Sequence, residues 1–375
     1  MNVKDYVEKN SEKYNSLLKT FTEIPSWTGG EQKREEFCLN YLKELGYTDV
    51  TSDEVGNVIC GYRTKPGKAN IAFMAHLDTV FDESADYTVK ARDNMLFAPG
   101  IGDNSVNAVS LLNLAEYVIK NDFEPEKGIY FVFSTGEEGL GNLIGSRTFT
   151  EKYKDRIFSF VALDLYYDKI FDTCVGSVRY RVSVETSGGH SYLDFGKKNA
   201  IAVLSEILAE VYSGNFDREY LTYNVGNITG GTTVNTIAAK ASMLFEFRSK
   251  KNSVMNKASD DFMTLVSEKM SDDVKISIEV LGKRPCGEPV CEEEKGRLVE
   301  SAADAITSTG LNAPIVTDAS TDCNIPLSLS IPAVSFGTCM GYKAHTLDEH
   351  IEEGSNLKGM EVLLKFFNSY VMEGR

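Results

Sequence analysis

The 375-residue sequence has no apolar run long enough to cross a membrane and no excess of basic residues. A membrane-spanning helix needs about 20 consecutive apolar residues. The first 20 residues, MNVKDYVEKNSEKYNSLLKT, are charged and amphipathic and lack the apolar centre of a signal peptide. A net charge of −16 argues against nucleic acid and anionic membranes as partners, because both bind clustered Lys and Arg. We therefore expect a cytoplasmic protein with neither partner.

The seven cysteines do not form the pattern of a disulfide framework or of a thiolate zinc site. Their number is odd, and no two of them occur in a Cys-x-x-Cys pair. The closest two, Cys286 and Cys291, lie in RPCGEPVCEEE, where no histidine is nearby. We expect reduced, buried thiols.

The order of apolar and amphipathic segments predicts two domains, one inserted into the other. A chain of this length exceeds the usual limit of a single hydrophobic core. Continuous apolar strands alternate with helical patterns over residues 1–175 and 284–375, which predicts a three-layer αβα domain with helices on both faces of a sheet. Residues 176–283 read as strand, helix, strand, strand, helix, strand, which predicts a ferredoxin-like unit.

One of only four histidines ends a predicted strand, in IAFMAHLDT. Residues two apart on an extended strand face the same side. His76 can therefore bind a metal while Asp78 accepts the second N–H of the imidazole. The alternative is a buried histidine that a neighbouring aspartate satisfies, and the pair alone does not decide between the two.

Three acidic residues follow or interrupt later strands. Glu137 and Glu138 follow IYFVFST, and adjacent residues on an extended backbone point to opposite sides. One can therefore bind a metal while the other takes a proton from water and passes it to a leaving amine. An acidic surface loop is the alternative. Asp164 lies within FVALDLYY, where a carboxylate must be paired, hydrogen-bonded or metal-bound.

Two further candidates lie in loops. Asp103, in APGIGDNSV, stands between glycines and a predicted helix, where capping is the commoner role of aspartate. His345, in KAHTLDE, precedes the last helix, whereas His350 is expected on the solvated surface. Nitrogen and oxygen donors suit divalent cations, and one carboxylate can bridge two of them. The combined set predicts a two-metal hydrolase with the candidate ligands His76, Asp103, Glu138, Asp164 and His345.

These motifs resemble those of the co-catalytic zinc metallopeptidases, which include peptidase T, carboxypeptidase G, aminoacylase, acetylornithine deacetylase and succinyl-diaminopimelate desuccinylase. The resemblance extends over nearly the whole chain and implies a zinc-exopeptidase-like catalytic domain. It implies that His76, Asp103 and Asp164 hold one metal. It also implies that Asp103, Glu138 and His345 hold the other, with Asp103 as the bridge.

The same resemblance assigns roles to residues around the metals. The bond between Asp103 and Asn104 is expected to be cis, Asp78 to orient His76, and Glu137 to act as general base and acid. Many members have Asp-Asp-Lys-Gly or Asp-Met-Lys-Gly at the bridging position, whereas peptidase T-like members favour Asp-Asn, as here.

The resemblance also makes the insert a lid and dimerisation domain. SGGHSYLDFG resembles the Gly-His-Ser motif of the family, so His190 is expected to donate to the oxyanion formed in the partner subunit's site. TTVNTIAAKASMLFEFRS resembles the substrate-contact segment, with Asn235 on the substrate and Arg248 on its carboxylate. A salt bridge is the alternative for Arg248. The loop DASTDCNIP resembles another substrate loop, with the weaker candidates Ser320, Thr321, Asp322 and Asn324.

The expectation is a homodimeric, two-metal hydrolase of small peptides, with zinc as the metal and cobalt or manganese as alternatives. The Asp-Asn pair favours an exopeptidase of the tripeptide aminopeptidase type. An N-acyl amino acid deacylase or a carboxypeptidase with the same metals stays open. A metal-binding scaffold without turnover is a different class, and the intact ligand set and Glu137 argue against it.

Overall fold

The computed structural model describes residues 2–374, which divide into two compact units. Unit 1 contains the chain up to Cys174 and from Glu288 onward, and unit 2 contains Val175–Gly287. Among the described residues, no helix combines the length and the apolar character that a membrane span requires.

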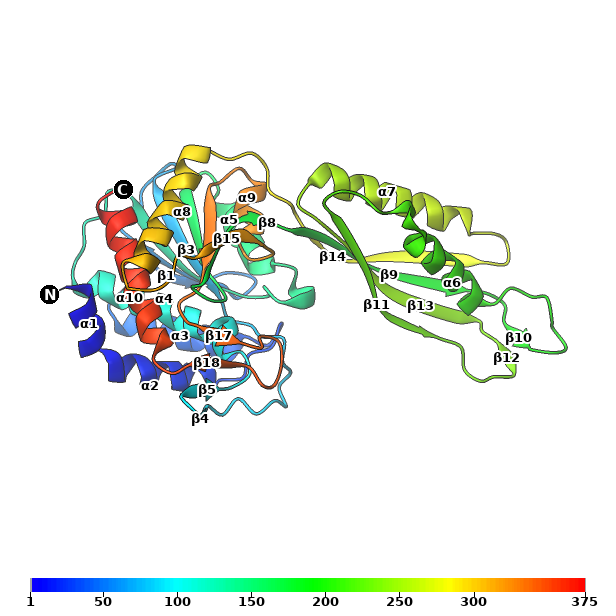
Figure 1. Ribbon diagram of the computed structural model, residues 1–375, viewed down its shortest axis with the longest axis horizontal. Coiled ribbons are helices and arrows are strands. Elements are labelled where there is room, and N and C mark those ends of the chain that lie inside the picture. The colour runs from blue at the N-terminus through cyan, green and yellow to red at the C-terminus, as the bar shows by residue number, and fades with distance from the viewer. Residues whose placement is uncertain (1, 375) are drawn as a thin grey trace. The chain divides into compact units, whose positions relative to one another are not determined.

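An eight-stranded mixed sheet forms the centre of unit 1, in the order β1-β2-β6-β3-β7-β16-β8-β15 (Figure 1). The four neighbours β6, β3, β7 and β16 run parallel, so their carboxyl ends lie along one edge. β6, β3 and β16 are buried along their whole length and β7 at all but one residue, as their continuous apolar sequences predict. The strands are β1 (Val50–Ser52), β2 (Val58–Tyr62), β3 (Asn70–His76), β6 (Gly128–Ser134), β7 (Ile157–Leu163), β8 (Lys169–Cys174), β15 (Ile315–Ala319) and β16 (Ala333–Phe336).

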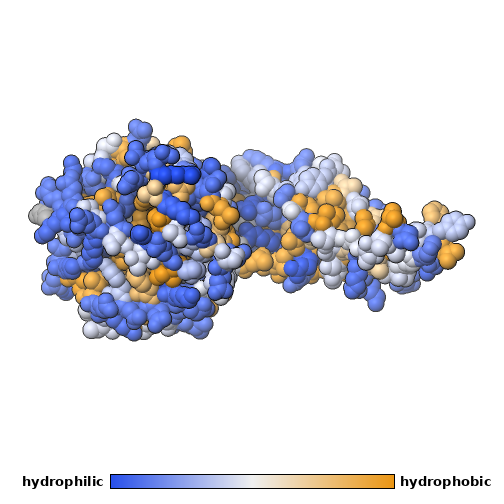
Figure 2. Space-filling model, turned by 90° about the horizontal axis from the view of Figure 1, so that it is seen from below, coloured by the Kyte–Doolittle hydropathy of each residue, from blue (hydrophilic) through white to orange (hydrophobic). Residues whose placement is uncertain are grey.

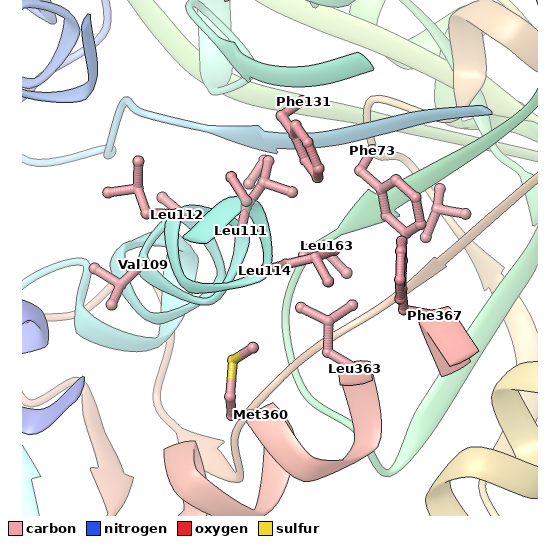
Figure 3. Packing of buried hydrophobic residues seen from close by; sticks show 14 of the residues in the cluster. Phe73, Val109, Leu111, Leu112, Leu114, Phe131, Leu163, Met360, Leu363 and Phe367 are labelled. Atoms are coloured by element: carbon pink, nitrogen blue, oxygen red, sulfur yellow. The ribbon is translucent and has the colours of Figure 1, made fainter. Parts of the chain in front are cut away.

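Helices cover both faces of this sheet, because alternate side chains of each buried strand enter opposite cores. Phe73 of β3 packs in a core with side chains of α4 and α10, which Figure 3 shows from close by, whereas Met74 joins a smaller core with α5 and α9. The mixed α/β fold expected from the sequence is therefore present. The helices of unit 1 are α1 (Val3–Lys9), α2 (Ser11–Thr22), α3 (Gln32–Glu44), α4 (Val106–Lys120), α5 (Ile144–Tyr153), α8 (Glu292–Thr307), α9 (Asn324–Ser328) and α10 (Ser355–Phe366).

A second, antiparallel sheet in unit 1 has the order β17-β18-β5-β4. Its strands are β4 (Lys90–Arg92), β5 (Met95–Phe97), β17 (Gly341–Tyr342) and β18 (His350–Glu352). The pairing of β18 with β5 brings the segment that contains His345 beside the segment that leads to Asp103. His350 is half-buried in β18, with its ring 4.5 Å from that of Phe97 and 5.5 Å from that of Tyr342. It is thus a partly exposed surface residue that packs between two aromatic rings, with Nδ1 2.7 Å from the carbonyl oxygen of Asp348.

Unit 2 is a four-stranded antiparallel sheet with two helices on one face. The strand order is β11-β13-β9-β14. Alternate residues of β9 and β13 share one core with α6 and α7. A two-stranded ribbon, β10 (Gly189–His190) with β12 (Thr236–Ile237), is attached to it. The main elements are β9 (Gly176–Glu185), α6 (Ala200–Glu210), β11 (Leu221–Gly230), β13 (Lys240–Ser249), α7 (Asn252–Glu268) and β14 (Lys275–Arg284).

Candidate metal centre

The ends of three neighbouring parallel strands carry four of the candidate residues. His76 is the last residue of β3, Asp164 follows β7 directly, and Glu137 and Glu138 lie three and four residues after the end of β6. Carboxyl ends of parallel strands are where sheets of this kind place their sites. The sheet therefore brings together side chains that lie up to 88 residues apart in the sequence.

Asp103 comes from an irregular turn before α4, not from a helix cap. The residue that precedes the helix is Ser105, and Asp103 and Asn104 have non-helical backbone angles with a cis peptide bond between them. Gly100 begins the turn with a φ of +68°, and a Cβ there would lie 2.3 Å from Cγ2 of Thr79. Only glycine fits this position.

The two carboxylate oxygens of Asp103 face different histidines. Oδ1 lies 3.2 Å from Nε2 of His76, and Oδ2 lies 3.2 Å from Nε2 of His345. Asp164 Oδ1 lies 3.6 Å from His76 Nε2, and Glu138 Oε1 lies 2.9 Å from His345 Nε2. The candidate ligands thus form two groups of three that share Asp103, and within each group the donor atoms lie within 4.8 Å of one another.

The imidazole of His76 has a donor atom that the described residues leave unsatisfied. Nδ1 lies 3.1 Å from the carbonyl oxygen of Asp78, but the buried Nε2 makes no hydrogen bond, since the contact with Asp103 lacks hydrogen-bond geometry. A buried polar atom without a partner is costly. A divalent cation would satisfy it, and the nitrogen and carboxylate donors match the ligands that zinc-type cations take. The residues present therefore fit a pair of metal ions.

The charges of the cluster support the same conclusion. Burial opposes ionisation of Asp103, but ion-pair contacts with His345 and His76 outweigh it and lower its pKa. Burial and the charge of Asp103 raise the pKa of Glu138 and of Asp164. Contacts with Asp103 and Glu138 raise the pKa of His345 to about 11. Buried carboxylates at this density require positive charge beside them, which two divalent cations supply.

Glu137 faces the same site from outside the two groups that share Asp103. Its residue is 5% exposed, and a carboxylate oxygen lies within 4.8 Å of donor atoms of His76 and Glu138. This position suits a carboxylate that exchanges protons with a reacting molecule. It is also close enough to these donor atoms for direct metal binding.

Asp78 holds the loop that carries both glutamates. Its Oδ1 accepts a hydrogen bond from the main-chain N–H of Glu137 at 3.0 Å. Its Oδ2 accepts one from the main-chain N–H of Glu138 at 2.9 Å and one from the hydroxyl of Thr28 at 2.8 Å. The carboxylate of Asp78 lies 3.4 Å from Nδ1 of His76, whereas the carbonyl oxygen of Asp78 lies only 3.1 Å from the same atom. The side chain expected to accept the imidazole N–H thus bonds mainly to main-chain N–H groups.

Two acids around the site were not identified from the sequence. Glu31 is 4% exposed, and its Oε1 accepts the main-chain N–H groups of Gly29 at 3.0 Å and Gly136 at 3.1 Å. Glu349 is fully buried, and burial together with the charge of Asp103 raises its pKa to about 8. No local sequence pattern identifies either residue. Both bind main-chain N–H groups, which nearly every residue offers, and most of these groups lie far away in the sequence.

Three of the four candidates in the loop expected to contact substrate are buried, and Ser320 is partly exposed. Thr321, Asp322 and Asn324 are at most 3% exposed, and Asn324 Oδ1 accepts the main-chain N–H of Thr321 at 3.0 Å. Asp322 Oδ2 accepts the hydroxyl of Ser134, at the end of β6, at 2.7 Å, and burial raises the pKa of Asp322 to about 6. The bond from Ser134 ties this loop to the end of β6, and its contact with substrate stays a prediction.

The candidate residues of unit 2 fall into two places. His190 and Asn235 are exposed on the ribbon, where the N–H of Ser191 donates to the carbonyl oxygen of Asn235 at 3.0 Å. Arg248 lies on β13, eight residues and about 26 Å along the strand from Lys240. It is half-buried, and its Nε lies 2.9 Å from Oε1 of Glu246. Unit 2 does not bring Arg248 together with the other two.

Comparisons with known proteins place the chain in a family and identify structures with the same fold. The profile of peptidase family M20/M25/M40 matches residues 72–369. A succinyl-diaminopimelate desuccinylase of Rickettsia canadensis (strain McKiel) is 25% identical over 263 residues, which cover 63% of this chain and 68% of that protein. A tripeptidase structure from Staphylococcus aureus has a TM-score of 0.77 at 21% identity, covering 95% of this chain and 97% of that one. Aminopeptidase PepT of Bacillus cereus has a TM-score of 0.75 at 20% identity, with coverages of 95% and 98%. At these identities the two structures show a shared fold.

Proposed function

Because the chain belongs to peptidase family M20/M25/M40, we propose that it is a two-metal exopeptidase that removes the N-terminal residue from small peptides. Membership makes it a metal-dependent peptidase or amidohydrolase. The observation that carries the two-metal proposal is Asp103, whose two oxygens each lie 3.2 Å from a different histidine and belong to different groups of donors.

The proposed ligands are His76, Asp103 and Asp164 for one ion and Asp103, Glu138 and His345 for the other. We take zinc as the metal, with cobalt or manganese as alternatives, because all three accept imidazole and carboxylate donors. When bound, such ions polarise the scissile carbonyl and lower the pKa of water towards neutrality.

The chain's own residues then position substrate and move protons. Glu137 takes a proton from the attacking water on a carboxylate oxygen and passes it to the nitrogen of the leaving amine, as its place beside His76 and Glu138 allows. Asp78 keeps that carboxylate in place through the main-chain N–H of Glu137. His190 donates to the oxyanion from the partner subunit, and Asn235 and Arg248 contact substrate, with the guanidinium on its carboxylate.

The preference for peptides over acylated amino acids rests on Asn104. Peptidase T-like members favour Asp-Asn at the bridging position, and the fold matches a tripeptidase and an aminopeptidase over 95% of this chain. Hydrolysis of an N-acyl amino acid is the second candidate, because the desuccinylase relative acts on such a bond by its name and is 25% identical. Both reactions use the same ligands and the same base.

We further propose that two copies associate through unit 2. Figure 2 shows hydrophobic side chains on the surface of this unit. The segments around the ribbon expose four large side chains, namely Tyr192 at 81%, Leu193 at 78%, Phe195 at 90% and Val234 at 101%. β11 is an edge strand whose outer side can accept another strand. Light scattering on the purified protein should give twice the mass of one chain, and replacing Phe195 and Val234 by serine should reduce it to one.

Product analysis by mass spectrometry tests the proposed reaction. Zinc-loaded protein is incubated with dipeptides, tripeptides and N-acyl amino acids, and the chelator-treated protein serves as the control. Release of free N-terminal residues is the expected result. Cleavage of acylated amino acids alone would overturn the aminopeptidase assignment in favour of the deacylase. No cleavage of any compound by protein with two bound zinc ions would reject both.

A further inference from the structure

Glu349 is a buried carboxylate that belongs to neither group of proposed metal ligands. It lies four residues after His345 and directly before β18, and it is fully buried. Its Oε1 accepts the main-chain N–H groups of Gly102 at 2.8 Å and Asp103 at 2.9 Å, and its Oε2 accepts that of Gly100 at 3.1 Å. One side chain thus holds the turn that presents Asp103.

The main chain of Glu349 is itself fixed by the second sheet. β18 pairs with β5 so that His350 lies opposite Phe97. One residue beyond this pair, the N–H of Ala98 donates to the carbonyl oxygen of Glu349 at 3.3 Å. The N–H of Glu349 donates to the carbonyl oxygen of Thr346 at 3.0 Å, which closes the loop that follows His345. Glu349 therefore connects two segments that are about 250 residues apart in the sequence.

Gly102 allows the carboxylate to come this close. A Cβ at position 102 would lie 3.1 Å from a ring carbon of Tyr166, 3.3 Å from Ile351 and 3.4 Å from Oε1 of Glu349. A side chain there would push the turn away from its acceptor. The glycines of this turn thus serve the approach of Glu349 as well as the backbone angle at Gly100.

A neutral acceptor would be cheaper to bury than a carboxylate beside other carboxylates. Three main-chain N–H groups at 2.8–3.1 Å, however, supply the hydrogen bonds that a buried acidic side chain needs. Only a carboxylate can accept from all three N–H groups, since a glutamine side chain would present a donor to one of them. The choice of glutamate therefore fits a need to hold the turn rigidly.

We propose that Glu349 is a positioning residue that holds Asp103 between the two metal ions and fixes it relative to His345. The proposal rests on the two-metal site of the proposed function, but not on its substrate. It predicts that Glu349 governs binding of the ion held by Asp103, Glu138 and His345, because two of these three ligands lie on segments that Glu349 connects. Outer-shell partners of this kind typically change metal affinity 10–100-fold.

Zinc titration of Glu349→Gln tests this prediction without any substrate. Metal-free wild type is titrated first by calorimetry, with zinc content per chain measured by mass spectrometry, and is expected to bind two ions. Glu353→Gln, on an exposed residue four positions later, is the control and should match wild type. Glu349→Gln should bind one ion nearly as wild type does and the other about 10–100-fold more weakly. Two ions bound with wild-type affinities would overturn the proposal.

Thermal unfolding separates positioning from a general structural role. If Glu349 only stabilised the fold, the variant would unfold at a lower temperature by the same amount with and without zinc. If it positions Asp103, the stabilisation that zinc adds should shrink, while the metal-free proteins differ less. An equal decrease in both states would reject the proposal. Should Glu349→Gln fail to fold, Glu349→Asp retains the charge but shortens the side chain, and the same two criteria apply to it.

Wild-type titration also separates this proposal from the proposed reaction. Two bound zinc ions without cleavage of any peptide would end the substrate assignment and leave the test of Glu349 intact. Wild-type protein that binds no second ion would reject the two-metal site and this inference together.

Discussion

Replacement of Glu137 by glutamine should abolish turnover while both metal ions stay bound. The amide has nearly the shape of the carboxylate but cannot take up a proton at neutral pH. The main-chain N–H of residue 137 remains bonded to Asp78 Oδ1, at 3.0 Å in the native chain, so the loop should keep its place. The residue is only 5% exposed, and the substitution adds no volume.

The size of the effect follows from the role assigned to this carboxylate. A positioned general base contributes typically 10²–10⁴-fold to the rate, or about 2.7–5.4 kcal/mol of the activation barrier. The loss should appear in kcat, because the carboxylate acts on water and on the leaving amine and not on bound substrate as such. The competing role is direct metal binding, which the distance of at most 4.8 Å to donor atoms of His76 and Glu138 allows.

Steady-state hydrolysis of a cleaved peptide and zinc content per chain, measured on the same samples, decide between these roles. Glu151→Gln, on an exposed face of α5, is the matched control and should behave as wild type in both assays. A variant at position 137 that keeps both zinc ions and at least a third of wild-type kcat would refute the assignment. Loss of zinc together with activity would make Glu137 a ligand.

Three further predictions concern the framework of unit 1. Asp78→Asn leaves one main-chain N–H of the glutamate loop without its acceptor, so kcat should fall about 10–100-fold in steady-state assays, and an unchanged kcat would contradict this role. Glu116 is buried, which opposes its ionisation, but hydrogen bonds with Lys120, Lys13 and Tyr41 outweigh burial and lower its pKa below 4.5. A pKa that is lower in the folded state stabilises the fold at pH values above the pKa of the unfolded state. Glu116→Gln should therefore lower the free energy of unfolding, measured in urea at pH 7, by about 2 kcal/mol. The loss should become smaller as the pH falls below about 4.5. In calorimetry, a chelator should lower the unfolding temperature of unit 1 and leave that of unit 2 unchanged, because the described metal-donor groups all lie in unit 1. A shift of both transitions would argue against this.

The central strands could be predicted because their burial leaves little ambiguity. The segment NIAFMAHLDTV is apolar from Ile71 to Ala75, and GIYFVFSTGEE is apolar from Gly128 to Phe133; they contain β3 and β6. A strand that is covered on both faces must be apolar on both, so the first polar residue marks its end. That same residue lies at the edge where a site can form, and the structure brings the five candidate ligands together there. Their roles as ligands stay predictions until metal binding is measured.

The elements that escaped prediction are short or exposed. α1 ends at Lys9 and α2 begins at Ser11, with no proline or glycine at the break to indicate two helices. The strands of the second sheet are two or three residues long, too short for a periodic pattern. β15 is an edge strand with Ile315 62% exposed, and its last two residues begin the segment DASTDCNIP that the resemblance makes a loop.

The acids that surround the ligands show why the positioning network is harder to predict than the ligands themselves. A ligand must be a particular residue type at a strand end or turn, so type and position together identify it. Glu31, Asp78 and Glu349 instead bind main-chain N–H groups, which every residue except proline offers. Their partners lie between two and 249 residues away, so no spacing is characteristic of the role. Their burial also changes the meaning of the net charge of −16, because part of it lies inside unit 1 around the donor groups and not on the surface. A negative interior of this kind favours divalent cations over any neutral occupant, and it would be strongly unfavourable in a protein that held none.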